Sequence, residues 1–548
     1  MTPSYKCISS TVRRFYTGGD ISFEHCFGFQ YADSSSVMLM IRKKGFDTSR
    51  YLSAQIQRIM DRVNRFDKLY LEFGGKLRYD HHASRVLPGY EIDTKVQMLR
   101  KLGNNIEIIH CISAKDIERR KIRRDFGLAY EDQILRDISD LKQLELDVSA
   151  VVISRYGGEQ TSDKFRQRLA NRGIRVITNS EIPDYHTDPN KVVSEEGYGK
   201  LHYVETDKKI VIITAPGPGS GKMSFAMGQI YHDRKIGIMS NFAKFETFPI
   251  WNLPLDHPVN IAYEAATADI GDYNCIDPFH KEACGVDATN YNRDVENFSI
   301  IRKIIEKITP AGDPLAEIRS PTDLGVNMAK EGIIDDSVVQ QASIDEIVRR
   351  YYQYHRDFVE GNVASDTLER MDKIMQRVQA KPEDRLVAIR ANNALEESSK
   401  KSKSAPNEMH TGAAIEIYPT DDAPVILTGK RSKILMSESA ALLNAVKYLA
   451  GIPDDIDILS PIIIESIMKL KKQMGIVDTN LDVKEVLDAL AVSGVFNPNA
   501  AECITVLPNL HGCDMHSTHL LGQGCEKALK ELGLILTTDA RIPQINNW

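Results

Sequence analysis

Residues 209–224 of the chain are KIVIITAPGPGSGKMS, a run of β-branched residues that leads directly into glycines, a lysine and a serine. The apolar part, Lys209–Thr214, predicts a buried β-strand, and we expect a helix over Phe225–His232. Glycines let backbone N–H groups approach phosphate oxygens, a helix N-terminus adds a favourable dipole, and a lysine supplies positive charge. The stretch therefore predicts an α/β fold with a phosphate-binding loop.

The same alternation of strands and helices precedes this loop. Four further β-branched stretches predict strands, at residues 68–73, 106–112, 148–154 and 174–178. Helices are expected near residues 93–102, 129–145 and 162–172. Such alternation indicates a mostly parallel sheet covered by helices on both faces, which is a three-layer α/β/α sandwich. Ligands bind at the carboxyl ends of the strands in these sheets, where glycines follow three of the predicted strands.

The chain is longer than one such sandwich needs. With 548 residues it is too long for a single core, and about three domains are expected. The predicted units are a poorly ordered N-terminal extension (1–44), the Rossmann-like α/β domain (45–295), a mainly helical segment with an exposed linker over 380–410 (296–410), and a separate C-terminal α+β domain (411–548). In the last unit we expect a hairpin across Asp421-Asp422 and a strand at 503–507.

Bulk composition excludes several classes of function. The net charge of −7 gives no general attraction to nucleic acid or anionic lipid. No apolar run approaches about 18 residues, so no transmembrane helix is expected. The eight cysteines lack C-x-x-C spacing, which is typical of reduced thiols in a reducing compartment. We therefore expect a cytoplasmic protein without nucleic-acid or membrane partners, of a size that often forms homo-oligomers.

The glycine loop departs from the Walker A pattern at two positions. Pro216 stands where the first glycine belongs, and Met223 stands where a serine or threonine would bind the metal. Ser224 comes one residue late, which is a rotation of roughly 100° on a helix. The residues expected to bind phosphate are Gly217, Gly219, Ser220, Gly221, Lys222 and Ser224. A tight turn that uses its glycines for backbone geometry alone is the alternative interpretation.

Downstream of the loop, residues 243–280 combine ionisable and aromatic side chains without a helical or strand period. Loops on a rigid scaffold often carry function, so this block is the predicted source of catalytic groups. The candidate catalytic residues are Lys222, Lys244, Glu246, Glu264 and His280. Asp269 and Asp272 are candidate Mg²⁺ ligands, because Mg²⁺ takes one or two carboxylates together with substrate phosphates. Helix capping and surface ion pairs remain the alternative for each residue taken singly.

Two weaker patterns complete the set of candidates. His82 and Arg85 follow the Gly74-Gly75 turn at the same sheet edge, and they are predicted ligand contacts, as is the anion-binding Arg293. In the C-terminal domain, zinc-ligand types occur at His511, Cys513, His516 and His519. Their spacing matches no standard structural zinc site, and Cys513 with His516 could instead be a thiol and its base. The sequence therefore favours Mg²⁺ with ATP or another nucleotide over zinc.

Several long motifs resemble a bacterial family of uncharacterised proteins, known as domain of unknown function 1846 or uncharacterised protein family 0371. These motifs are YLEFGGK (70–76), HASRVLPGYE (82–91), APGPGSGKM (215–223), AKFETFPIWNLPL (243–255), HPVNIAYEAATADI (257–270), IDPFH (276–280) and NYNRDVE (290–296). The similarity runs from about residue 44 to the C-terminus. It implies an α/β sandwich, a helical portion and a C-terminal α+β domain, with no established activity. Some members carry the label ATPase or ATP-dependent zinc protease. This sequence has no H-E-x-x-H motif to support the protease label, and the ATPase label depends on the imperfect glycine loop.

The leading hypothesis is an enzyme that binds a nucleotide or another phosphorylated small molecule at residues 216–224. The polar block would then support Mg²⁺-dependent phosphoryl transfer or ATP-dependent ligation. One alternative is a Rossmann-like enzyme that uses a phosphorylated metabolite or dinucleotide without hydrolysis, although Lys222 stands where the third glycine of G-x-G-x-x-G belongs. The other alternative is a non-enzymatic binding or regulatory protein.

Overall fold

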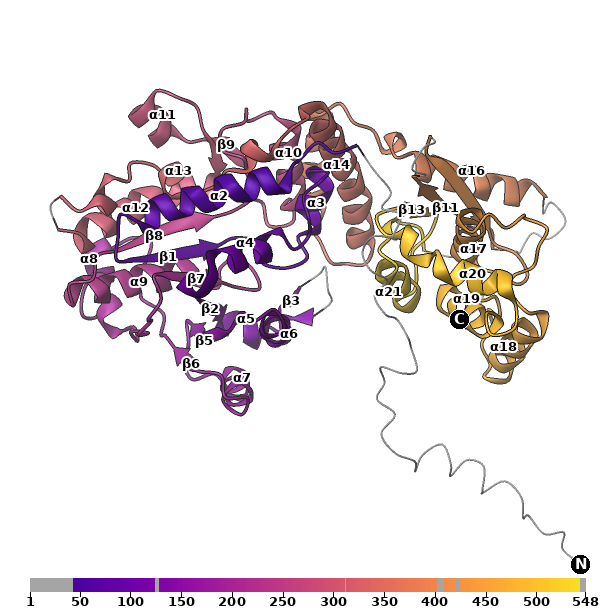
Figure 1. The fold of residues 1–548 in the computed structure, drawn as a ribbon, viewed down its shortest axis with the longest axis horizontal. Coiled ribbons are helices and arrows are strands. Elements are labelled where there is room, and N and C mark those ends of the chain that lie inside the picture. The colour runs from indigo at the N-terminus through magenta and orange to yellow at the C-terminus, as the bar shows by residue number, and fades with distance from the viewer. Residues whose placement is uncertain (1–42, 124–127, 311, 402–408, 419–422, 543–548) are drawn as a thin grey trace, which may run out of the picture.

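The computed structural model describes residues 43–123, 128–310, 312–401, 409–418 and 423–542. The expected N-terminal extension lies almost entirely outside these residues, as does the turn expected at Asp421-Asp422. Figure 1 shows two lobes side by side. The N-terminal lobe is built on a six-stranded sheet, and the C-terminal lobe on a four-stranded sheet.

The central sheet of the N-terminal lobe has the strand order β6-β5-β2-β7-β1-β8. Its strands are β1 (Lys68–Phe73), β2 (Ile106–Ser113), β5 (Val148–Ser154), β6 (Val176–Thr178), β7 (Ile210–Thr214) and β8 (Ser240–Phe245). All neighbouring strands pair in parallel, which confirms the predicted α/β fold. The sequence prediction missed β8, because Ser240, Asn241 and Lys244 interrupt its apolar residues.

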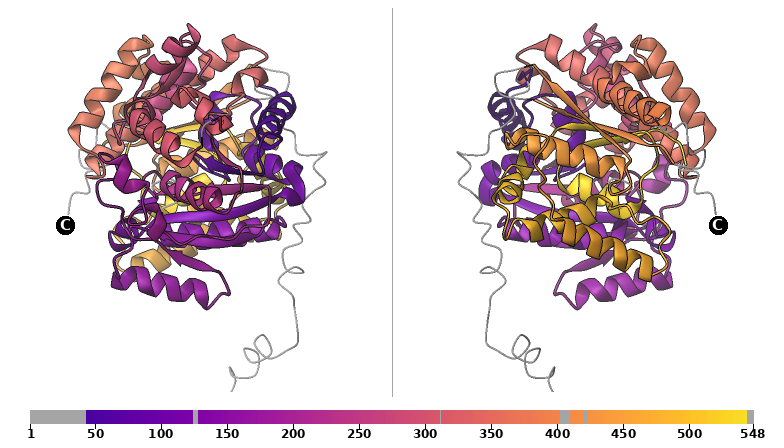
Figure 2. Two further views of the ribbon diagram at one scale, coloured as in Figure 1. Left: turned by 90° about the vertical axis from the view of Figure 1, so that its left-hand side faces the viewer. Right: turned by 90° about the vertical axis from the view of Figure 1, so that its right-hand side faces the viewer.

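Helices bury both faces of this sheet (Figures 1 and 2). Leu69, Leu71 and Phe73 of β1 belong to one core, with α2 (Thr48–Val63), α4 (Thr94–Leu102), α10 (Pro258–Ala266) and α14 (Asp336–Val359). Tyr70 belongs to the opposite core, with α9 (Lys222–Lys235) and α12 (Asn292–Ile308). Because strand side chains alternate, Glu72 shares the face of Tyr70. A carboxylate therefore lies in the layer between the sheet and these two helices.

Shorter elements complete the lobe. They are α3 (His81–Val86), α5 (Ala114–Glu118), β3 (Ile122–Arg123), β4 (Leu128–Ala129), α6 (Tyr130–Gln143), α7 (Gln160–Ala170), α8 (Pro189–Val192), β9 (Asn274–Ile276), α11 (Pro278–Cys284), β10 (Thr289–Tyr291), α13 (Pro321–Leu324) and α15 (Ser365–Arg377). The polar block 243–280 contains the end of β8, α10, β9 and the start of α11, and the turns and loops predicted for it join these elements. Helix α9 begins at Lys222 rather than at Phe225, because the left-handed Gly221 (φ 85°) caps it.

The first part of the stretch 380–410, predicted as an exposed linker, is largely helical, and residues 402–408 lie outside the described residues. It contains α16 (Leu386–Lys401), whose Val387 and Ala391 pack on Ala414 of the C-terminal sheet. Gly412 is needed at this contact, since a Cβ there would lie 2.3 Å from the carbonyl oxygen of Ala391. The C-terminal lobe therefore includes α16.

The four-stranded sheet of the C-terminal lobe has the order β12-β11-β13-β14. Strands β11 (Gly412–Ile417) and β12 (Val425–Lys430) pair antiparallel, as predicted, and β13 (Asp514–Ser517) and β14 (Ile535–Thr538) follow. The helices are α17 (Ser437–Leu449), α18 (Pro461–Gln473), α19 (Val483–Ser493), α20 (Pro498–Thr505) and α21 (Gln523–Glu531). The strand predicted at 503–507 is wrong, because Asn497 and Pro498 start a helix that buries Cys503.

The two lobes meet along α14. Tyr352 packs edge-on against His516, and Arg356 forms an ion pair with Glu526 at 2.7 Å. Near α3, burial and the neighbouring cations, including His511 of the C-terminal lobe, lower the pKa of His81 to about 4. The carboxyl end of β1, which leads into α3, therefore lies toward the C-terminal lobe (Figure 1).

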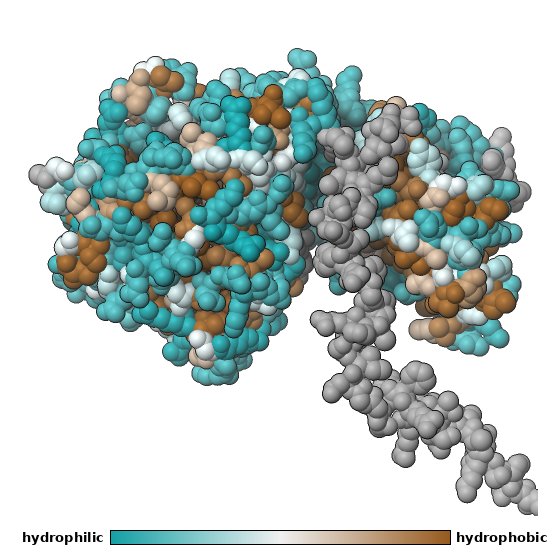
Figure 3. Space-filling view, viewed as in Figure 1, coloured by the Kyte–Doolittle hydropathy of each residue, from teal (hydrophilic) through white to brown (hydrophobic). Residues whose placement is uncertain are grey.

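The surface of the C-terminal lobe carries several apolar groups in Figure 3, where brown patches lie among teal and white residues. Exposed apolar side chains in this lobe include Ile462, Leu470, Met474, Val495 and Phe496. None of the helices in the described part of the chain is both long and apolar enough to span a bilayer.

Candidate active site

Charged side chains gather at the carboxyl edge of strands β1, β7 and β8. Lys222 is the first residue of α9, directly after the glycine loop, and its Nζ lies 3.4 Å from Oε1 of Glu72. Glu72 is paired in register with Lys244 of β8, so the two side chains share one face of the sheet. The structure thus joins Lys222 and Lys244 through a carboxylate that the sequence prediction did not name.

Two more carboxylates surround Lys244. Its Nζ lies 2.6 Å from Oδ2 of Asp294, in the first turn of α12, and 3.3 Å from Oε2 of Glu246. Gly74 makes room for Glu246, since a Cβ at that position would lie 2.2 Å from Glu246 Cγ. We call Glu72, Lys222, Lys244, Glu246 and Asp294 the edge cluster.

The charges of the edge cluster shift its protonation equilibria. Burial raises the pKa of Glu246 to about 7, and the carboxylates of Asp294 and Glu72 add to the rise, which the two lysines oppose. Burial alone would lower the pKa of Lys244, but the surrounding carboxylates outweigh it and raise that pKa. A carboxyl with a pKa near neutrality can both take up and release a proton at physiological pH.

One oxygen of the cluster has no partner. Within the described part of the chain, Oε2 of Glu72 is buried without a hydrogen bond. A buried carboxylate oxygen in this state carries a desolvation cost that a bound donor or cation would remove. Among the residues that the structure describes, the edge cluster is therefore incomplete.

The glycine loop packs tightly beside the cluster. A Cβ at Gly217 would lie 2.2 Å from the hydroxyl of Tyr130, and a Cβ at Gly221 would lie 2.8 Å from Ser154. Gly219 and Gly221 have φ of 75° and 85°, which disfavours any other residue there. Packing at Gly217 and Gly221, and the positive φ of Gly219 and Gly221, therefore account for these three glycines whether or not the loop holds a ligand.

The hydrogen bonds of the loop involve its carbonyl groups. Ser220 Oγ donates to the carbonyl of Gly217 at 2.8 Å, and Ser154 Oγ donates to that of Ser220 at 2.9 Å. Arg155 donates to the carbonyl of Gly219. No acceptor among the described residues takes the backbone N–H of Gly219, Gly221 or Lys222. These N–H groups, at the N-terminus of α9, are therefore available to an anion.

The other predicted residues near the loop have different partners. Ser224, expected to bind phosphate, lies against the hydroxyl of Tyr185. Arg293 forms an ion pair with Asp272, and Asp269 accepts a hydrogen bond from Tyr354 at 3.3 Å. Among the described residues, no group of three or more His, Cys, Asp or Glu side chains is arranged to hold a metal ion.

Glu264 and His280 are not brought into the edge cluster. Glu264 accepts hydrogen bonds from Arg377 at 2.6 Å and from the backbone of Asn274 at 3.2 Å. The contact with Arg377 is an ion pair that links α10 to α15. His280 lies 3.3 Å from Ser320 Oγ and 3.7 Å from Asp323. It borders a cavity, together with Trp251.

His82 and Arg85 belong to a second charged group. Glu346 of α14 accepts five N–H groups at 2.6–3.1 Å, from Arg85, Arg349 and Arg350, and its Oε1 lies 3.3 Å from His82. Burial alone would raise the pKa of Glu346, but the arginines outweigh it and hold the pKa well below its ordinary value. We call these five residues the arginine cluster. The rings of Phe248 and Tyr263 pack on His82, and Tyr263 in turn contacts Tyr291 beside Lys244.

The cysteine and histidines of the C-terminal lobe point to different partners. His516 is buried and lies between Thr537 (2.9 Å) and Asp539 (3.2 Å). His519 lies 3.2 Å from Ser517, and the buried Cys513 donates to the carbonyl of Asn509. His511 packs on Gly533.

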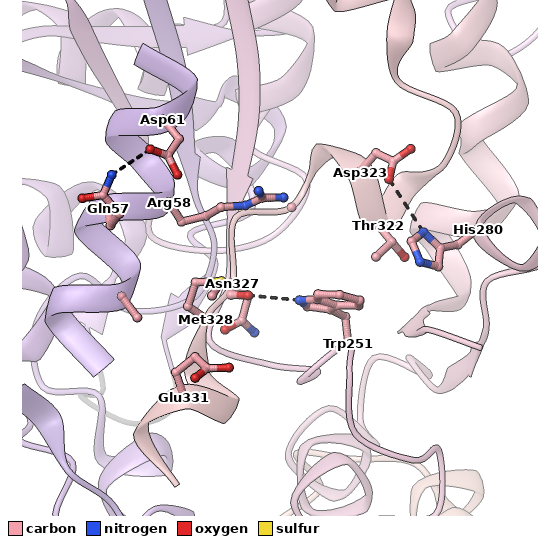
Figure 4. Close-up of a pocket in the computed structure, with 12 residues that line it drawn as sticks. Gln57, Arg58, Asp61, Trp251, His280, Thr322, Asp323, Asn327, Met328 and Glu331 are labelled. Atoms are coloured by element: carbon pink, nitrogen blue, oxygen red, sulfur yellow. Dashed lines mark hydrogen bonds and ion pairs between the residues drawn. The ribbon is translucent and has the colours of Figure 1, made fainter. Parts of the chain in front are cut away.

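A cavity of about 580 Å³ opens beside the edge cluster, between α2 and the segment that carries Trp251 (Figure 4). A smaller cavity of about 40 Å³ lies against Lys244, Glu246 and Asp294, and the two cavities share Trp251 and Asn327 in their walls. Through the smaller cavity, the edge cluster therefore adjoins a larger space that can hold a small molecule.

Sequence reasoning missed Glu72, Asp294 and Trp251. A signal for Glu72 was present, since it is the acidic residue in the otherwise apolar end of the strand KLYLEF, and a buried unpaired carboxylate is costly. Asp294 resembles an ordinary residue of a first helical turn, where acidic side chains are favoured. Only the packing of α12 against β8 shows that it reaches Lys244.

Comparison with known proteins identifies the family. A model of the domain of unknown function DUF1846, N-terminal, matches residues 44–379, and a model of its C-terminal domain matches 383–547. A UPF0371 protein of Clostridium tetani (strain Massachusetts / E88) is 46% identical over 503 residues, covering 91% of this chain and 98% of the relative. A UPF0371 protein of Clostridioides difficile (strain 630) is 45% identical over 508 residues, covering 92% and 99%. The chain therefore belongs to the uncharacterised DUF1846 family, whose curated members carry the name UPF0371 protein.

Proposed function

We propose that the protein binds a phosphorylated small molecule at the 216–224 loop and that Glu246 and Lys244 carry out proton transfer on it. One observation carries this proposal: the incomplete edge cluster lies directly beside loop N–H groups that have no acceptor among the described residues. Both features call for a ligand, since no group in the described part of the chain fills either need. A phosphate ester accepts N–H groups, and the Mg²⁺ that accompanies it or the hydroxyl groups of its organic part would pair with the carboxylate.

The phosphate would lie at the N-terminus of α9. The N–H groups of Gly219, Gly221 and Lys222 would donate to its oxygens, and the helix dipole favours its negative charge. The Lys222 ammonium, now 3.4 Å from Glu72, would turn partly toward the phosphate and neutralise it. Ser220 is held by its bond to the carbonyl of Gly217 and would keep the loop in shape.

Glu246 supplies the acid–base function. With a pKa of about 7 it exists in both protonation states at neutral pH. The Lys244 ammonium, whose Nζ lies 3.3 Å from Oε2 of Glu246, holds the ionised carboxylate in place. In phosphoryl transfer or ligation it would accept the proton of the attacking group. Asp269 and Asp272 have Tyr354 and Arg293 as partners, so Mg²⁺ arriving with a nucleotide would meet the free oxygen of Glu72 instead.

A second candidate uses the same site without transfer of the phosphate. The near-neutral pKa of Glu246 suits proton abstraction from a phosphorylated metabolite held by the loop, and such chemistry needs no metal. Release of phosphate from the ligand that binds would exclude this candidate. A purely regulatory role predicts that binding survives when Glu246 and Lys244 are replaced and that no ligand is converted.

A thermal-shift screen tests the proposal. The purified protein is heated with ATP, GTP, NAD, NADP, sugar phosphates or inorganic phosphate, each with and without Mg²⁺. A ligand at a hundred times its dissociation constant stabilises the folded state by about 2.7 kcal/mol, so a binding ligand raises the melting temperature. The shift should disappear in Lys222→Ala and persist in Lys235→Ala, a control at the other end of the same helix.

No stabilisation by any phosphate compound would contradict the proposal, and the loop would then be a structural turn. An equal shift in both lysine variants would place the ligand elsewhere. Because removal of Lys222 leaves Glu72 without its cation, the unfolding transition of unliganded Lys222→Ala is needed as the baseline.

A further inference from the structure

The cavity beside the edge cluster has one aromatic wall. Trp251 is fixed there because its indole Nε1 donates to the carbonyl of Asn327 at 3.0 Å, and its backbone carbonyl accepts from Thr289 at 2.9 Å. The ring of His280 packs against it edge-on, with centroids 5.9 Å apart. The indole is therefore a rigid platform that lines an open space of about 580 Å³.

A cation lies on the other side of this space. Arg58 is an exposed residue of α2, and Figure 4 shows its side chain extending from the helix toward the part of the cavity where Trp251 and Thr322 lie. No carboxylate or hydrogen-bond acceptor for Arg58 occurs among the residues that the structure describes. By contrast, the next arginine on the helix, Arg62, donates to backbone carbonyl groups. The Arg58 guanidinium is thus free to stack on a bound ring.

Hydrogen-bond acceptors complete the wall. Asp61 and Glu331 line the cavity, and their carboxylates can accept amino and ring N–H groups. Asp61 is occupied on one oxygen by Gln57 at 2.7 Å, and Glu331 lies 3.9 Å from Arg50. A planar platform, a guanidinium and two carboxylates suit a flat, nitrogen-rich ring and do not suit a purely aliphatic group.

The cavity continues toward the edge cluster. The small cavity at Lys244 and Glu246 shares four residues with the large one, namely Trp251, Thr322, Gly325 and Asn327. One molecule could therefore place a ring against Trp251 and extend its other end toward Glu246. A volume of this size is typical of sites for whole cofactors or drug-sized ligands.

We propose that this cavity binds a nitrogen heterocycle of the nucleobase class, stacked between Trp251 and Arg58, as the second half of the ligand whose phosphate lies at the glycine loop. The inference deepens the proposed function and depends on it only for the phosphate end. The ring end is independent, since Trp251 and Arg58 make no contact with Lys222 or with the loop in the described structure. It assigns the substrate to nucleosides and nucleotides rather than to sugar phosphates.

The sequence provides a selective optical test. The chain has two tryptophans, Trp251 and the final residue Trp548, so Trp548→Phe leaves Trp251 as the sole indole. Its fluorescence is titrated with adenosine, guanosine, cytidine and uridine, which carry no phosphate, and with ribose as the ring-free control. Stacking of a base on the indole should quench this fluorescence in a saturable way for at least one nucleoside and not for ribose.

Two arginine variants test whether the bound base stacks against Arg58. Arg58→Ala in the Trp548→Phe background should weaken nucleoside binding by about 5-fold or more, the lower end of what one stacking partner contributes. Arg65→Ala is the matched control, since Arg65 follows the same helix and pairs with Glu317 at 2.7 Å. It should leave the affinity unchanged.

The outcomes separate the two proposals. Lys222→Ala should leave quenching by the nucleoside intact while it removes binding of inorganic phosphate. A failure of the nucleobase proposal can therefore be told apart from a failure of the phosphate proposal. The inference is overturned if no nucleoside quenches Trp251, if ribose quenches it equally, or if Arg58→Ala binds the nucleoside as well as Arg65→Ala does. Quenching that depends on Arg58 and on the base supports it.

Discussion

The edge cluster and the arginine cluster are both groups of buried and half-buried charged side chains in the N-terminal lobe, and they differ in how fully they are paired. In the arginine cluster, Glu346 accepts five N–H groups, and its pKa is held well below the ordinary value. In the edge cluster, Oε2 of Glu72 has no partner among the described residues, and the pKa of Glu246 is raised to about 7. The described residues fully pair the carboxylate of the arginine cluster, and they leave one carboxylate oxygen of the edge cluster unpaired.

This difference shows what kind of buried charge indicates a binding site. A saturated carboxylate stabilises the contact between α3 and α14 and gains nothing from a ligand. A buried carboxylate that lacks a partner destabilises the folded protein, and a ligand that pairs with it removes this destabilisation. Such unfavourable groups are found mainly at functional sites. His82 and Arg85 therefore suit a structural role better than the ligand contacts predicted from sequence.

The largest expected effect is in the arginine cluster. Glu346→Gln leaves three guanidinium groups without their shared carboxylate and should lower the free energy of unfolding at pH 7 by about 3–5 kcal/mol. Because the folded-state pKa lies below the ordinary 4.5, this stabilisation is present above pH 4.5 and is lost as the pH falls. Urea denaturation measures it, with the exposed Glu465→Gln as control; equal stability of the two variants would contradict the account.

The edge cluster should show the opposite dependence on pH. The folded-state pKa of Glu246 is raised from 4.5 to about 7, so its contribution to stability is fully present below pH 4.5 and is lost as the pH rises to 7. Glu246→Gln mimics the protonated carboxyl and avoids this loss. Its stability relative to wild type should therefore increase between pH 4.5 and 7, by on the order of 1–3 kcal/mol. Parallel curves for wild type and Glu246→Gln, like those expected for the exposed Glu282→Gln, would show that Glu246 is not perturbed.

A smaller effect tests whether the edge cluster acts as one unit. The carboxylate of Glu72 helps to raise the pKa of Glu246, so Glu72→Gln should lower that pKa. The pH-dependent difference in stability that Glu246→Gln causes should shrink by about 0.5–1 kcal/mol when it is measured in the Glu72→Gln background. The same denaturation series at each pH completes this double-mutant cycle. A difference of unchanged size would mean that the two carboxylates do not interact.

The sequence predicted the scaffold well because its signals are local. The β-branched runs located β1, β2, β5, β6 and β7, and the glycines after Thr214 located the start of α9 to within one turn. The prediction failed where tertiary context overrides local preference. Strand β8 carries polar residues because it is an edge strand that ends at the site, and α16 is helical because its small residues pack on the sheet at Gly412.

The site could be predicted only in part for the same reason. Lys222, Lys244 and Glu246 were identified from their residue types, and the structure brings them together. Their connection through Glu72 depends on the register between β1 and β8, and the contact with Asp294 depends on how α12 packs. No local pattern contains this information. Glu264, by contrast, forms an ion pair with Arg377, a partner more than a hundred positions away in the chain.

The most direct test of the central claim is a calorimetric titration of pyrophosphate into the protein and its lysine variants. The account predicts saturable binding by wild type, at least about 10-fold weaker binding by Lys222→Ala, since a charge-assisted hydrogen bond is lost, and unchanged binding by Lys235→Ala. Wild type that binds no pyrophosphate, or a dissociation constant shared by all three proteins, would contradict it and leave the glycine loop as a structural turn.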